Sequence, residues 1–187
     1  YNGLSELRYK LSAMIEDMVE GEIVNEIFQK SVTECMKTIE ILKAETILKV
    51  VRFIKTAQKI YIIARGSTAW IAKDVELQLQ LLGYNAYMLS DSEVMKKSDK
   101  LFRHGDLIII FSIKNSTPEL LLTAQNAKKV GANVVTCCCL PKTDLEDYSD
   151  LSVLGYNQRN KTIEDFDIVS RLPLQIIART LIDYLNL

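Results

Sequence analysis

The distribution of hydrophobic residues changes period along this chain, and each change marks an expected element. Residues 60–64 and 107–111 are continuous β-rich apolar runs with no polar alternation. Such runs are typical of strands that are covered on both faces. Shorter apolar runs predict three further strands, at residues 85–89, 133–136 and 151–154.

Helical spacing of apolar positions occupies the segments between these strands. The expected helices cover about residues 44–56, 68–82, 93–102, 117–130 and 166–184. Strands that alternate with helices indicate a doubly wound parallel sheet. The sequence therefore predicts an α/β fold, with a five-stranded parallel sheet flanked by helices as in flavodoxin, preceded by an N-terminal helical arm.

The first part of the chain has helical spacing only. Residues 1–20 are too short to form a domain, so we interpret them as the remnant of another domain or a linker. The apolar positions from Val24 to Leu42 form one helical stripe, and residues 21–57 are expected to be a helical arm packed on the α/β domain. That domain is predicted to cover residues 58–187.

The last expected helix is apolar over most of its circumference. One face of a sheet covers only one side of a helix, so we interpret the remaining apolar surface as a subunit interface. Core packing alone is the alternative.

Composition narrows the class of protein. The 187 residues suffice for one full core, and 48% hydrophobic with 25% charged residues is close to the average for globular domains. The formal net charge of −1 gives this segment no general attraction for nucleic acid or an anionic membrane. No apolar run is long enough for a membrane span and no signal peptide opens the chain, so we expect a cytoplasmic location. Because the chain does not begin with Met, we expect it to be part of a longer protein.

Four cysteines are present, Cys35 and the consecutive Cys137, Cys138 and Cys139. Neighbouring cysteines do not pair easily, and no CxxC spacing points to zinc. We expect the run to be the buried end of a strand. A thiol that reacts with a ligand or an oxidant is the alternative.

The candidate chemistry follows the two strongest strands. In a doubly wound sheet, ligands bind beyond the carboxyl ends of the strands. The loop after 60–64 offers Gly66, Ser67 and Thr68, and the loop after 107–111 offers Ser112, Lys114, Asn115, Ser116 and Thr117. Hydroxyls and amides at the start of a helix favour an anion, usually a phosphate. Pro118 suits a first helical turn, and Glu119 is expected to form a capping box with Ser116.

The order of these motifs resembles the SIS (sugar isomerase) domain, and the subtype resembles the RpiR family of bacterial transcription regulators. The resemblance rests on residues 64–68, residues 105–119 and residues 131–136. The segments that favour the regulator subtype are residues 3–11, 45–47, 81–84 and 170–175. The first of these is similar to the end of a helix-turn-helix domain.

The resemblance implies a phosphosugar sensor that forms homodimers or homotetramers and binds DNA through an N-terminal domain outside this segment. It places Thr68, Ser112 and Thr117 at the hydroxyl positions of the ligand site. Lys114 and Asn115 depart from the family, which usually has serine and glycine there. Asn tolerates left-handed backbone better than most residues, and Lys114 would pair with a phosphate as a point charge. A carboxylated or unphosphorylated sugar is the alternative ligand.

The sequence favours a binding domain over an enzyme, and it points to no cofactor and no metal. Aldose–ketose isomerisation needs a base, commonly a carboxylate, and often a histidine. His104 precedes the strand at 107–111, so it is expected at the amino end of the sheet. Glu164, Asp165 and Asp167 keep an isomerase as an alternative, and a module that only oligomerises is a third reading. Ser170 and Arg171 are further candidate ligand contacts, whose alternative roles are a helix cap and a surface ion pair.

Overall fold

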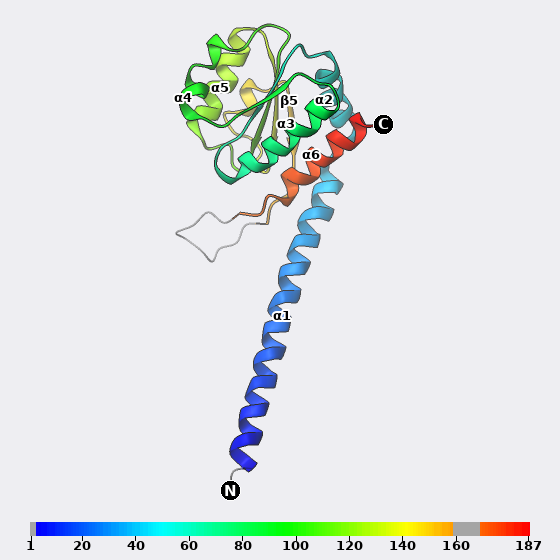
Figure 1. The fold of residues 1–187 in the computed structure, drawn as a ribbon, viewed down its shortest axis with the longest axis vertical. Coiled ribbons are helices and arrows are strands. Elements are labelled where there is room, and N and C mark those ends of the chain that lie inside the picture. Colours follow the sequence, from blue (N-terminus) through cyan, green and yellow to red (C-terminus); the bar gives the residue numbers. More distant parts are fainter. Residues whose placement is uncertain (1–2, 159–168) are drawn as a thin grey trace.

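A computed structural model describes residues 3–158 and 169–187, and its centre is a parallel five-stranded sheet (Figure 1). The strands are β1 (Ile60–Ile63), β2 (Ala86–Leu89), β3 (Leu107–Ser112), β4 (Asn133–Cys138) and β5 (Leu151–Leu154). Their order is β2-β1-β3-β4-β5, and every neighbouring pair is parallel. The predicted fold class and all five predicted strands are confirmed.

Six helices surround or precede this sheet in the described residues. They are α1 (Gly3–Ile41), α2 (Ala44–Thr56), α3 (Ala69–Leu81), α4 (Ser92–Lys96), α5 (Pro118–Lys129) and α6 (Leu172–Leu185). Short 3-10 turns lie at Gly66–Thr68, Ser98–Lys100 and Glu146–Tyr148. The weak helix expected at 93–102 is thus α4 followed by a 3-10 turn.

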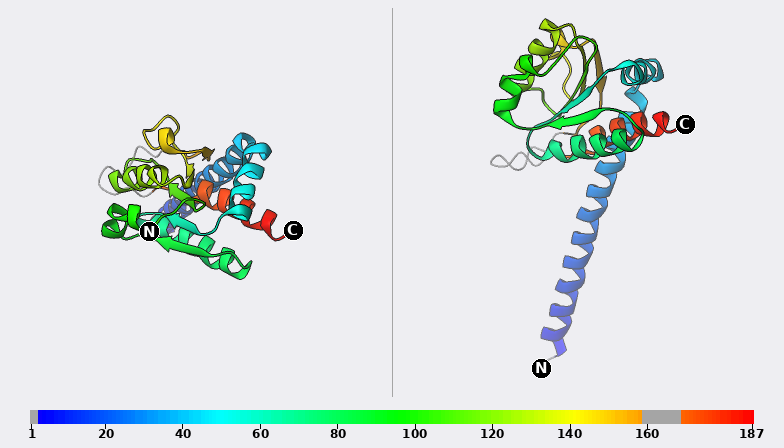
Figure 2. Two further views of the ribbon diagram at one scale, coloured as in Figure 1. Left: turned by 90° about the horizontal axis from the view of Figure 1, so that it is seen from above. Right: turned by 45° about the horizontal axis from the view of Figure 1, so that its top comes forward.

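Alternate strand residues enter two separate cores, which explains why the strand sequences show no polar alternation. Ile62 and Ile109 pack with α2, α3 and α6 on one face, whereas Ile63 and Ile110 pack with α4 and α5 on the other. The two views of Figure 2 show the sheet between these layers. Burial on both faces is the rule for parallel sheets.

The helix α1 is continuous from Gly3 to Ile41, and most of it projects away from the sheet (Figure 1). Only its C-terminal part packs on the domain, where Glu34 and Thr38 are buried. We expected an arm that packs on the domain, but Val24, Ile27 and Phe28 are exposed. Most of the stripe that the sequence shows therefore has no cover within the described residues, although Leu42 at its end packs against the core.

The apolar surface of α6 is covered within the chain. Its buried residues are Pro173, Leu174, Ile177, Ala178, Leu181 and Ile182. The helices α1, α2 and α3 all contact α6, as does β4. The excess apolar surface that suggested a subunit interface is thus accounted for by core packing, because three helices rather than one sheet face cover it.

The helix α6 begins later than the sequence predicted. It was expected from residue 166, but residues 169–171 are not helical and residues 166–168 lie outside the described residues. Pro173 occupies the first turn, where proline is tolerated, and this marks the start of the helix. Ser170 and Arg171 therefore belong to the segment that leads into α6, not to the helix itself.

Candidate functional site

Two loops meet at the carboxyl ends of the adjacent strands β1 and β3. The chain leaves β1 towards β2 and leaves β3 towards β4, so the strand order reverses between them. Such a switch point opens a crevice at the carboxyl edge of the sheet, where ligands bind in doubly wound folds. The loop 64–68 and the loop 112–117 flank this crevice.

A cavity of about 140 Å³ lies in this crevice. It is lined by Arg65, Thr68, Phe111, Ser112, Ile113, Lys114, Ser116, Thr117, Leu120, Val169 and Arg171. The two loops and the segment before α6 thus converge on one space. Pockets that enclose whole drug-sized ligands measure about 300–1,000 Å³, so this cavity suits one end of a ligand, such as a phosphate group.

The hydroxyl groups in the cavity are set up to donate hydrogen bonds. Ser112 Oγ accepts from the Asn115 backbone N–H at 3.0 Å, and Thr68 Oγ1 accepts from Arg171 Nε at 3.4 Å. A hydroxyl whose oxygen already accepts a bond has its own proton left to donate. Thr117 is the residue before α5, and its side chain makes no capping bond to that helix. These three hydroxyls suit a guest rich in acceptors.

The charge around the cavity is positive. Arg65, Lys114 and Arg171 line it, and its described lining contains neither a carboxylate nor a histidine. The N-terminus of α5, a helix of 12 residues, adds the partial positive charge of its unpaired N–H groups. The donor hydroxyls and the cations together favour an anion.

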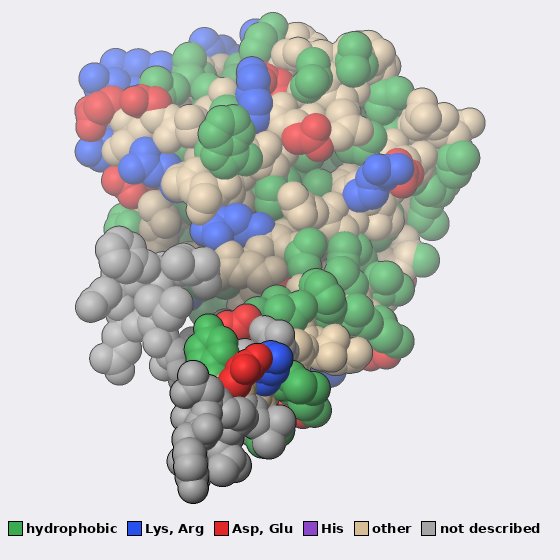
Figure 3. Space-filling model, turned by 60° about the horizontal axis from the view of Figure 1, so that its bottom comes forward, with side chains coloured by type: hydrophobic (Ala, Val, Ile, Leu, Met, Phe, Trp, Pro, Cys, Tyr) green, Lys and Arg blue, Asp and Glu red, His purple; other side chains and the backbone are tan. Residues whose placement is uncertain are grey.

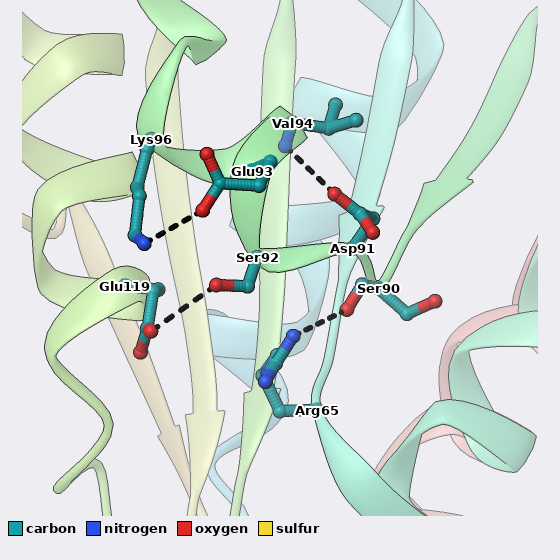
Figure 4. Close-up of polar contacts among 8 residues, drawn as sticks. All are labelled: Arg65, Ser90, Asp91, Ser92, Glu93, Val94, Lys96 and Glu119. Carbon is teal, nitrogen blue, oxygen red and sulfur yellow. Dashed lines mark hydrogen bonds and ion pairs between the residues drawn. The ribbon is translucent and has the colours of Figure 1, made fainter.

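Arg65 and Glu119 are held by contacts with the segment after β2 (Figure 4). Arg65 Nη1 donates to Ser90 O at 2.9 Å, and Ser92 Oγ donates to Glu119 Oε1 at 3.3 Å. A hydrogen bond from its own backbone N–H, more than any other cause, lowers the pKa of Glu119. The capping box predicted between Glu119 and Ser116 is wrong, because Glu119 reaches across to Ser92 instead.

Six of the ten predicted site residues line the cavity. They are Thr68, Ser112, Lys114, Ser116, Thr117 and Arg171. The other four, Gly66, Ser67, Asn115 and Ser170, do not. Gly66 has a left-handed φ of 55° and starts the turn before α3. Arg65 and Val169 also line the cavity, although the sequence analysis did not select them. The only signal for Arg65 was its position next to Gly66, and Val169 gave none.

Asn115 and Ser170 do not line the cavity, but each is next in the chain to a residue that does. Asn115 has a φ of 55°, is buried, and donates from Nδ2 to Thr143 Oγ1 at 3.1 Å. It therefore adopts the left-handed backbone that the sequence analysis allowed for asparagine in place of glycine. Ser170 Oγ accepts from Leu172 N at 3.3 Å just before α6, but the N-cap residue of that helix is Arg171.

Hydrogen bonds link the cavity to the arm. Asn157 Nδ2 donates to Ser170 O at 3.1 Å and to Glu34 Oε1 at 3.2 Å, and Gln158 N also donates to Glu34 Oε1 at 2.9 Å. Ser170 directly precedes Arg171 of the cavity, and Glu34 belongs to α1. One asparagine side chain thus connects the segment of Arg171 to α1.

Cys137 and Cys138 form the buried end of β4, as expected, and the half-buried Cys139 follows them. Burial raises the pKa of the Cys138 thiol to about 11 and that of Cys139 to about 12, and it also raises the pKa of Cys137. His104 is exposed and precedes β3, so it lies at the amino end of the sheet, away from the cavity. Glu164, Asp165 and Asp167 lie outside the described residues.

These pKa values make the three neighbouring thiols poor nucleophiles, because the thiolate is the reactive form. At pH 8 we expect Cys138 and Cys139 to react with iodoacetamide at least about tenfold more slowly than an ordinary thiol of pKa about 8.5. The rate should rise as the pH approaches 11. Peptide mapping by mass spectrometry measures this, and fast labelling at pH 8 would restore the reactive-thiol alternative.

A family model described as SIS domain matches residues 53–182. Two curated relatives are uncharacterized HTH-type transcriptional regulators. The Clostridium perfringens protein is 23% identical over 81% of this chain and 54% of its own length. The Thermotoga maritima protein is 26% identical over 93% of this chain and 63% of its own length. The chain therefore spans between about half and two thirds of these two relatives.

Solved structures share the fold. The sugar isomerase domain of an RpiR transcription factor from Sphaerobacter thermophilus has a TM-score of 0.79, with 15% identity, over 88% of this chain and 89% of that chain. The Vibrio vulnificus NanR protein complexed with ManNAc-6P has a TM-score of 0.78, with 20% identity, over 95% of this chain and 67% of that chain. Phosphoheptose isomerase GmhA from Neisseria gonorrhoeae has a TM-score of 0.72, with 14% identity, over 89% of this chain and 98% of that chain.

Proposed function

Because this chain belongs to the SIS domain family, we propose that it senses a phosphorylated sugar, or a related anionic sugar, for a DNA-binding transcriptional regulator. In this proposal the segment binds its effector without turnover and holds subunits of a homodimer or homotetramer together. DNA would be bound by a further part of a longer protein.

One observation carries the proposal: the cavity combines four hydroxyl side chains and three cations, with no carboxylate or histidine in its described lining. Hydrogen bonds to charged groups contribute roughly 1.5–3 kcal/mol each, so three or four of them suffice for micromolar binding. Isomerisation needs a base to move a proton between carbons. The described cavity thus has groups for holding an anionic sugar, whereas it has no evident group for converting one.

Two further observations support a regulator. The hydrogen bonds through Asn157 connect the ligand segment to α1, which leads towards the N-terminal end of the chain. Both curated relatives described above are named as HTH-type regulators, and the NanR protein of similar fold was solved with a sugar phosphate. The part of α1 that contacts the sensor would then report occupancy of the cavity.

A phosphosugar isomerase is the second candidate, favoured by one observation: GmhA, named as an isomerase, has the same fold over nearly its whole length. In that case a base would have to come from outside the described lining. Glu164, Asp165 and Asp167 remain the candidates from the sequence. A module that only oligomerises is the third reading.

Thermal unfolding with a panel of sugar phosphates separates these three readings. A ligand at about 100 times its Kd stabilises a protein by about 2.7 kcal/mol, which raises Tm by about 5–10 °C for a chain of this size. We expect one compound to give such a shift, and its unphosphorylated parent sugar to give a much smaller one. NMR of the mixture should show the compound unchanged. An isomerised product would establish the enzyme, and the lack of any shift would favour the oligomerisation module.

A further inference from the structure

The projecting part of α1 carries a row of hydrophobic side chains that nothing in the described chain covers. Their exposed fractions lie between 49% and 69% for Leu11, Met14, Met18, Phe28, Val32 and Ile39. Figure 3, which views the molecule with this end brought forward, shows hydrophobic side chains on the surface among charged ones. A contiguous apolar surface of this kind marks an interaction site in a water-exposed helix.

The spacing of the row is that of a coiled coil. The positions 11, 14, 18, 21, 25, 28, 32, 35 and 39 alternate in steps of three and four along the helix. This is the heptad pattern that turns one seam of a helix towards a partner helix. Apolar residues occupy these positions except at Gly21 and Asn25. The pattern continues from Leu11 to Ile39, a span of about four heptads.

The seam does not face the domain from which the helix projects. Glu34 and Thr38 are the α1 residues buried against residues 156–158. Successive residues of a helix are rotated by about 100°, so Thr38 and its neighbour Ile39 point in clearly different directions. Val32 and Ile39 stay exposed beside this contact. The described seam is therefore open up to the domain, except at Cys35, which is half-buried.

We propose that this seam is an interface with a second copy of the chain, in which the two α1 helices pair parallel and in register. The two polar or small positions support this occupant. Asn25 at a core position is a known determinant of register in parallel pairs, because two asparagines facing each other satisfy their amides. Gly21 has nothing within 4 Å of its Cβ position, so a partner backbone has room to approach there.

A second copy fits better than an unrelated helix. Its seam has the same length, and its asparagine lies at the same height along the helix, so the two Asn25 side chains meet. A twofold pair is also the commonest arrangement of protein subunits, and it uses one patch on both partners. An antiparallel pair would place Asn25 against an apolar residue or Gly21, which leaves its amide unpaired. The parallel pair keeps the two domains at the same end and the two N-terminal ends of α1 side by side.

Disulfide trapping locates this interface in the 187-residue chain. The parent carries Cys35→Ala, which removes the native thiol of the seam, and two variants add either Asn25→Cys or Ile23→Cys. Ile23 is a matched control, because it is exposed on the other side of the same helix. Cysteines join when their Cα atoms lie about 4.4–6.8 Å apart, a distance that in-register helices provide at the seam.

We expect mild oxidation to give a covalent dimer at least about tenfold faster with Asn25→Cys than with Ile23→Cys. Adding Met18→Glu to the Asn25→Cys chain should slow the reaction at least about tenfold, because it puts a charge into the seam. The same addition of Val19→Glu, one residue away and off the seam, should leave the rate unchanged. Circular dichroism confirms that all variants keep their helix content.

Equal trapping at positions 23 and 25 would overturn the proposal, and so would no trapping at either. The second result would leave another part of a longer protein, or no partner at all, as the explanation of the exposed seam. Neither result bears on the sugar-binding cavity, because ligand binding there is measured separately, by thermal unfolding with the sugar phosphates. The interface and the proposed sensor function are therefore tested separately.

Discussion

Replacing Arg171 with alanine is expected to weaken the binding of a sugar phosphate by about 10- to 100-fold. Arg171 lines the cavity and donates to the Thr68 hydroxyl, so it both attracts an anion and orients a donor. A hydrogen bond to a charged group contributes about 1.5–3 kcal/mol, and each 1.4 kcal/mol is a tenfold change in Kd. Isothermal titration with the compound found in the ligand panel measures the loss.

The matched control for this change is Arg179→Ala. Arg179 lies within the helix α6 that follows Arg171, where it is exposed and pairs with Asp183. Its removal should leave the affinity unchanged. Thr117→Val, which removes only a hydroxyl, should also weaken binding while the chain stays folded. Equal affinities for wild type, Arg171→Ala and Thr117→Val would show that the anion binds elsewhere.

Phe111→Ala is expected to lower the free energy of unfolding by about 3–5 kcal/mol, the usual range for deleting a buried phenylalanine. Phe111 is completely buried in β3, where it lies opposite Cys137 of β4 and also forms part of the cavity lining. The loss corresponds to a drop in Tm of roughly 6–20 °C for a chain of this size. Urea unfolding followed by circular dichroism measures it as a lower midpoint with an unchanged slope.

The control for this prediction is Leu81→Ala at the end of α3, where the side chain is 78% exposed. Exposed positions usually change stability by less than about 0.5 kcal/mol. The contrast between the two variants separates core packing from hydrophobicity as such. If the free energy of unfolding of Phe111→Ala lay within about 1 kcal/mol of the wild-type value, the described packing around β3 would be wrong.

The sheet could be predicted from the sequence because each strand is buried on both faces. Ile62 and Ile63 enter different cores, so neither position tolerates a polar residue, and the run 60–64 reads as apolar throughout. The helix α2 was predicted with its observed bounds, since its apolar stripe is sharp. Local pattern and global fold agree in these elements.

The cavity could be predicted only in part, because its lining depends on how distant segments meet. The hydroxyls of Thr68, Ser112 and Thr117 follow strands, and a parallel sheet aligns strand ends at one edge. Val169 gives no such signal, since nothing local shows that its segment folds back to β1 and β3. The orientation of the Asn115 side chain could not be predicted either, because it depends on a contact with Thr143 in the loop after β4.

The two helices at the ends of the domain were misread for the same physical reason. A helical stripe shows that a face is apolar, but it does not show what covers that face. The α6 surface is covered by α1, α2 and α3, although we expected a partner subunit there. The projecting part of α1 is open, although we expected the whole arm to pack on the domain, as α2 and the C-terminal part of α1 do. Among the helices that the structure describes, none has the length and hydrophobicity of a membrane span.

The crystal structure of this chain with a bound sugar phosphate tests the central claim most directly. We predict phosphate oxygens within about 3.2 Å of the Ser112 and Thr117 hydroxyl oxygens and of the Arg171 guanidinium nitrogens. The sugar should extend out of the cavity, because only its phosphate end fits in about 140 Å³. A phosphate bound away from the carboxyl ends of β1 and β3, with these side chains unchanged, would contradict the account.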